Sequence, residues 1–294
     1  MSLSDTIQQS EIITNIATHI ISHAIVDYEE LLTKERLSIA CAFLQRVTST
    51  HLCNHKLTTE GIVYKFQGQE FQLHESFKTM TLTRSVYEHL VLFFFLYEYP
   101  FTDEIRDVVW NYWKINSKKN MLDCLSEEGA RLEKTRAEAY MEIESLRRAI
   151  FATRTGYLCR EKLDEWTATD KPTQNGTIAF YRNHGRLDVR KVSYNYAWKY
   201  IFPKDDMTVL YRHLSIHCHP IYNGLLQYQS QMADDDDAAA MPLFLSCCFL
   251  GCLCHLFLNQ LPGSDQLLQN EFSAKELQVF KTLYSPLATT QSPQ

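Results

Sequence analysis

The chain has 294 residues, of which 45% are hydrophobic, and it contains only nine glycines and eight prolines. So few turn-forming residues favour a mostly helical protein, and the length is ample to bury a core. The net charge of −6 excludes a bulk basic field that would attract nucleic acid, but it leaves room for a local basic patch.

The nine cysteines are an odd number and form no C-x-x-C pair, and four of them crowd into one apolar segment. This usage favours reduced thiols in a cytosolic protein over a disulfide framework. The N-terminal MSLSDTIQQSEIITN has no basic region followed by an apolar run, so no signal peptide is expected. We therefore predict a cytoplasmic protein.

The first part of the chain has the period of helices. Between residues 5 and 25 the apolar residues recur at helical spacing, which predicts one helix, and a second is expected over 28–50. The stretch GIVYKFQGQEFQLH then alternates around Gln67-Gly68, which predicts a small β-hairpin near residues 61–74.

The middle of the chain is apolar first and highly charged afterwards. Residues 75–98 predict a helix buried on most sides that ends at Pro100. Residues 102–155 predict a long, solvated helical stretch with charge pairs four residues apart, broken near 116–119. The segment 160–206 is less regular, and DKPTQNGT within it is expected to be a loop.

The last part returns to helices. We expect a helix over 207–231, a solvated acidic loop at 234–237, an apolar helix over 242–258 and a short helix over 273–283. The tail 285–294 is expected to be disordered. The predicted fold class is all-α: a single helical domain over 1–284, built as a multi-helix bundle with one small hairpin.

The apolar segment PLFLSCCFLGCLCHLFL allows three interpretations. It could span a membrane, although it is at the short limit and contains a serine and a histidine. It could bind zinc, because Cys248, Cys252 and His255 share one helical face, with His217 or His219 as the fourth ligand. It could be a central core helix, in which small residues let neighbouring helices approach closely. The core helix is the interpretation we favour, and we expect neither a metal, nor a cofactor, nor a membrane partner.

The segment YRHLSIHCHP, residues 211–220, concentrates polar side chains on one face of a predicted helix. Each helical residue turns by about 100°, so Ser215 and His219 return to the face of Arg212, and Asn223 extends the stripe. His217 lies about 140° away from Arg212. Histidine can move protons near neutral pH and arginine can hold a phosphate, so this stripe could cleave RNA without a metal.

This arrangement resembles the motif of the HEPN superfamily (higher eukaryotes and prokaryotes nucleotide-binding). That motif is an arginine, commonly followed by a polar residue, and a histidine a few positions later. Here Arg212-His213 begins it, and it closes at His217 by the commoner spacing or at His219 by helical geometry. The resemblance implies a helical bundle, a homodimer and metal-independent ribonuclease activity in a toxin–antitoxin or antiphage system. Two other pairs have the spacing without the preferred polar residue: Arg46 with His51, and Arg84 with His89.

A second resemblance covers more of the chain, about residues 75–260. The chain is similar to a family of bacterial helical domains of unknown function that pair an R-x-x-x-E helix with a later Tyr…Leu-Ser-x-x-x-His helix. The matching positions are Arg84 and Glu88, then Tyr211, Leu214, Ser215 and His219. The resemblance implies a helical fold and supports Ser215 and His219 as a pair.

These observations lead to one main functional hypothesis. The chain would be a bacterial defence or toxin-type endoribonuclease acting on RNA, as a homodimer or with a partner protein. Arg212 would contact the phosphate, and His219, or else His217, would be the general acid and base. Arg84 and Glu88 would orient them.

Two alternatives remain open at this point. In the first, the same arginine, glutamate, serine and histidine side chains form a structural network in a non-catalytic sensor or scaffold protein. In the second, the chain is a membrane-acting effector that uses residues 242–258.

Overall fold

The computed structural model describes residues 2–73, 76–124, 130–169, 176–204, 207–216 and 236–287. Over these residues the chain is mostly helical, which confirms the prediction of a helical bundle with a small hairpin. The chain divides into two compact units, Met1–Phe93 with Trp198–Gln294, and Phe94–Ala197. The single domain over 1–284 stays a prediction, and residues 288–294 of the expected disordered tail lie outside the described residues.

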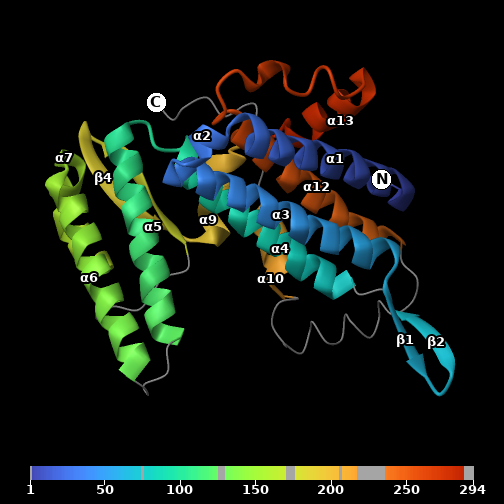
Figure 1. The fold of residues 1–294 in the computed structure, drawn as a ribbon, viewed down its shortest axis with the longest axis horizontal. Helices are drawn as coiled ribbons and strands as arrows, with labels where there is room; N and C mark the ends of the chain where they lie inside the picture. The colour runs from blue at the N-terminus through green and yellow to red at the C-terminus, as the bar shows by residue number, and fades with distance from the viewer. Residues whose placement is uncertain are drawn as a thin grey trace. The chain divides into compact units, whose positions relative to one another are not determined.

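The first unit is a helical bundle built around α12 (Figure 1). α12 packs against α1, α3, α4 and α13, and α10 packs against α4. The helix α9 (Tyr194–Ile201) crosses the boundary between the units. The helices of the first unit are α1 (Leu3–Asp27), α2 (Glu29–Leu32), α3 (Glu35–Thr59), α4 (Ser76–Phe93), α10 (Thr208–Ile216), α12 (Asp236–Leu258) and α13 (Ala274–Tyr284), with a short 3-10 turn at Ser264–Gln266.

The apolar helix α12 is the core helix of its unit. Its stretch Ala240–Leu258 is long and apolar enough to cross a membrane, yet 72% of that window is buried inside the protein. A Cβ atom added at Gly251 would lie 2.9 Å from Cβ of Leu283, so α13 approaches α12 closely at this glycine. Our favoured interpretation of this segment, a core helix with small residues at the contacts, is therefore confirmed.

The burial of α12 predicts unreactive thiols. Cys247, Cys252 and Cys254 are completely buried, and burial raises the pKa of the Cys248 thiol to about 12. Cys53 and Cys124 are exposed. Because the thiolate is the nucleophile, a short pulse of iodoacetamide should label the two exposed cysteines and leave α12 unlabelled until the protein is denatured. Peptide mapping by mass spectrometry measures this. Equal early labelling of α12 would mean that the helix is not in a packed core.

The predicted hairpin is present as β1 (Ile62–Phe66) and β2 (Gln69–Leu73), paired in antiparallel register. Its turn is Gln67-Gly68, with φ of 50° and 80°. Two positive φ values in a two-residue turn match the right-handed twist of the strands, and glycine meets that requirement without strain.

The second unit packs two helices of the charged stretch against each other. These helices are α5 (Asp103–Cys124) and α6 (Ala130–Ala152). α5 runs without interruption through residues 116–119, so the break predicted there is wrong. Asn116 and Lys119 are buried inside α5, and the Lys119 ammonium donates to the carbonyl of Ala168 at 2.7 Å. The polar residues that look like an interruption are instead contacts within the unit.

The second unit also contains a hairpin that was not predicted from the sequence. β3 (Thr177–Asn183) and β4 (Arg186–Val192) pair in antiparallel register around His184-Gly185, with φ of 48° and 78°. The Tyr99 hydroxyl donates to the carbonyl of Phe180 at 2.9 Å and ties β3 to the start of the unit. The remaining elements are the π-helical turn Phe94–Glu98, α7 (Arg154–Leu158) and α8 (Arg160–Thr167).

Candidate functional site

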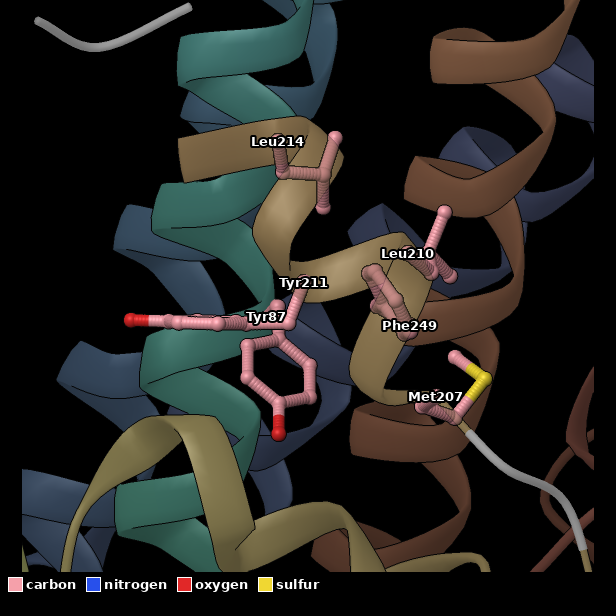
Figure 2. Close-up of a pocket in the computed structure, with 6 residues that line it drawn as sticks. All are labelled: Tyr87, Met207, Leu210, Tyr211, Leu214 and Phe249. Carbon is pink, nitrogen blue, oxygen red and sulfur yellow. The ribbon is translucent and has the colours of Figure 1, made fainter. Parts of the chain in front are cut away.

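Helix α10 carries the start of the polar segment and packs against α4, with one side chain of α12 close by. Leu214 is 1% exposed, and it lines one small pocket together with Tyr87 of α4 and Phe249 of α12. Figure 2 shows these side chains with Met207, Leu210 and Tyr211 around one small apolar pocket. The side chains leave no volume there that a water molecule could enter, so this pocket is a packing contact and not a ligand site.

Next to this contact, Arg84, Glu88 and Tyr211 form a polar cluster. The Arg84 Nε donates to Oε1 of Glu88 at 2.8 Å, and the Tyr211 hydroxyl donates to the same oxygen at 3.3 Å. The Arg84 guanidinium carbon lies 5.4 Å from the centre of the Tyr211 ring. Burial, followed by the charge of Glu88, raises the pKa of Tyr211. The phenol is therefore a hydrogen-bond donor at neutral pH.

This cluster is only partly closed to solvent. The side chains of Arg84 and Glu88 are 23% and 28% exposed. Pairing at positions four apart is expected for an isolated helix, but the third member, Tyr211, comes from another helix. The cluster thus fixes the rotation of α10 on α4.

The predicted site residues separate into three groups. Arg84, Glu88 and Tyr211 are brought together. Ser215 and Arg212 lie on α10 but do not join this cluster. The Ser215 hydroxyl donates within its own helix, to the Tyr211 carbonyl at 2.7 Å, and Arg212 is exposed. The other predicted residues lie outside the described residues: His217, His219 and Asn223.

The proposed metal face of α12 is occupied by packing. The Cys252 sulfur lies 3.9 Å from the carbonyl oxygen of Leu283, and the His255 ring stacks on Tyr284 at 4.1 Å between centres and 6° between planes. Burial lowers the pKa of His255. Within the described part of the chain, no group of three histidine, cysteine or acidic side chains is placed to hold a metal ion.

A buried polar network was not predicted from the sequence. His51 of α3 is completely buried, with Nε2 at 2.9 Å from Oγ of Ser10 and Nδ1 at 2.8 Å from Oγ of Ser246. His55 Nδ1 lies 2.9 Å from the same Ser10 oxygen. Burial lowers the pKa of His51 to about 3. His51 is therefore neutral and out of reach of RNA, although Arg46 and His51 have the spacing of the nuclease motif.

The third pair with this spacing ends at His89, which is partly buried. Its Nδ1 donates to the carbonyl of Ser85 at 2.7 Å, and its ring packs at 73° to the ring of Phe43, with 5.9 Å between the ring centres. Burial lowers the pKa of His89. The ring is thus held in one orientation by its own helix and by α3.

In comparisons with protein-family models, with curated proteins and with solved structures, no match to this chain is found.

Proposed function

We propose that the chain is a metal-independent endoribonuclease with a HEPN-like bundle, acting in bacterial defence or as a toxin. One observation carries the proposal. Tyr211 is held on α4 by Glu88 and Arg84, while the next residue, Arg212, is exposed. These contacts of Tyr211 fix the rotation of α10 and so the direction in which the Arg212 side chain points. A phosphate-binding residue needs such a fixed direction.

The chemistry assigned to this face needs two groups. The Arg212 guanidinium holds the scissile phosphate and stabilises the charge that develops on its oxygens. His219, or else His217, accepts the proton of the 2′-hydroxyl as that oxygen attacks phosphorus, and the 5′-oxygen leaves with a proton from a histidine. Arg84 and Glu88 act through Tyr211 as positioning residues. A homodimer would bring two such faces to one RNA.

The second candidate is a non-catalytic helical sensor or scaffold protein. The observation that favours it is that Arg84, Glu88, Tyr211 and Ser215 each make a hydrogen bond or ring contact within the chain. Satisfied polar networks of this kind give a bundle one defined packing. In this case the cluster has a structural role and no catalytic one, and Arg212 is an ordinary surface residue.

The deciding experiment is cleavage of total tRNA and of a single-stranded RNA with and without EDTA. We expect cleavage that survives EDTA and falls by at least about a hundredfold in Arg212→Ala and in His219→Ala, because each removes a group that acts in the transition state. His217→Ala tests the alternative histidine. Arg46→Ala removes another exposed arginine of the first unit and should leave cleavage unchanged.

Melting curves of the same variants separate the two candidates. The nuclease proposal requires Arg212→Ala and His219→Ala to have the same melting temperature as the wild-type protein. If no RNA is cleaved and His219→Ala melts several degrees lower, the histidine belongs to a structural network and the sensor or scaffold is correct.

A further inference from the structure

The β3–β4 hairpin of the second unit is a basic surface in an acidic protein. Between Thr177 and Val192 the sequence contains four arginines or lysines and one aspartate, although the whole chain has a net charge of −6. Arg182, Arg186 and Arg190 are all exposed. Local charge of one sign attracts a partner of the other sign even when the net charge of the molecule does not.

The single aspartate of this hairpin is already paired with a lysine from outside the hairpin. Asp188 accepts from the Lys162 ammonium of α8 at 2.7 Å and from the Tyr181 hydroxyl at 2.8 Å. These bonds lower the pKa of Asp188, Lys162 first. The carboxylate therefore stays charged and paired, so it subtracts little from the field of the neighbouring arginines.

Aromatic rings are placed among these cations. The Arg190 guanidinium lies 5.1 Å from the centre of the Tyr181 ring, on a diagonal across the two strands, and the Lys191 ammonium lies 4.8 Å from the centre of the Trp166 ring. Tyr181 and Trp166 are both partly exposed. Such side chains stack on unpaired bases while neighbouring arginines contact phosphates.

We propose that the hairpin face formed by Tyr181, Arg186 and Arg190 binds single-stranded nucleic acid. Cations alone would fit any anionic partner, but the partly exposed Tyr181 ring among them favours a ligand that has both phosphates and bases. The identity of that nucleic acid as RNA rests on the proposed function. Binding at the hairpin itself does not.

The test is fluorescence anisotropy with a labelled 2′-O-methyl oligonucleotide of about 16 nucleotides, the upper end of what one single-strand module covers. The methyl group blocks attack by the 2′-oxygen, so the probe is bound without being cleaved. A DNA oligonucleotide of the same sequence forms the second arm, and an RNA duplex forms the third. Vesicles of neutral and of anionic lipid test the other class of anionic partner.

In Arg186→Ala/Arg190→Ala we expect the Kd to rise about tenfold or more, and the slope of log Kd against log salt to shrink by about 1.4. Tyr181→Leu should raise the Kd by about fivefold or more with little change in that slope, because it removes stacking and not charge. Arg186→Gln, near the turn, repeats the charge test with a slope change of about 0.7, in a variant that keeps the Tyr181–Arg190 contact. Lys56→Ala/Lys134→Ala removes two charges from exposed side chains elsewhere and should change neither quantity.

The outcomes separate this inference from the nuclease. Binding that depends on the hairpin, without cleavage of unmodified RNA, supports the proposed binding surface and overturns the nuclease proposal. If the wild-type protein cleaves RNA, and all hairpin variants keep this cleavage and the wild-type Kd, the binding surface is overturned and the nuclease proposal stands. Failure of the wild-type protein to bind any oligonucleotide at low salt, equal loss of binding in the lysine control, or hairpin-dependent binding to anionic vesicles alone also overturns it.

Discussion

Acidification to about pH 4.5 should destabilise the first unit by about 3 kcal/mol through His51 alone. The ring is completely buried between Ser10 and Ser246, and burial lowers its pKa to about 3. In the unfolded chain the pKa of a histidine is about 6.5, so between these two values the unfolded state binds the extra proton. The stabilisation is complete above pH 6.5 and is lost as the pH falls toward 3.

Urea denaturation at neutral pH and at about pH 4.5, followed by circular dichroism, measures this effect. In His51→Gln the amide keeps polar contacts to the two serines but does not titrate, so the difference between the two pH values should shrink by about 3 kcal/mol. His184→Asn removes an exposed histidine at a turn and should keep the wild-type difference. An unchanged difference in His51→Gln would show that His51 is not buried as a neutral ring.

Local signals in the sequence predicted the parts of the fold that depend on local structure. The period of residues 5–25 gave the helix found at Leu3–Asp27, and the alternation around Gln67-Gly68 gave the first hairpin. The second hairpin was missed because β3 begins with four consecutive buried residues and shows no alternation. A strand covered on both faces has no polar side to produce that signal.

The site was predictable to the same extent. Arg84 and Glu88 are four apart on one helix, and their ion pair follows from that spacing. Tyr211 joins them from 123 positions away in sequence, and only the second family resemblance pointed to it. The serine–histidine network could not be predicted, because Ser10, His51 and Ser246 come from three helices whose rotations are set by packing.

The strongest expected effect of a small substitution is in the second unit, at Gly156 of α7. A Cβ atom at this position would lie 1.9 Å from the carbonyl oxygen of Ile150, far closer than any non-bonded contact allows. That oxygen cannot withdraw freely, since it accepts from the Thr153 amide at 3.1 Å and from the Thr153 hydroxyl at 2.7 Å. The same hydroxyl accepts from the Gly156 amide at 2.8 Å and caps α7.

Gly156→Ala must therefore break this turn, and we expect a loss of about 3 kcal/mol, the upper end for overpacking. Hydrogen exchange measured by mass spectrometry reports where the loss appears. If the two compact units unfold separately, exchange should accelerate within 94–197 and stay unchanged in α1, α3 and α12. Leu158→Ala, an exposed position of the same short helix, should have little effect on either unit. Faster exchange throughout the chain would instead show that the two units unfold as one cooperative domain, the single domain over 1–284 that the sequence predicts.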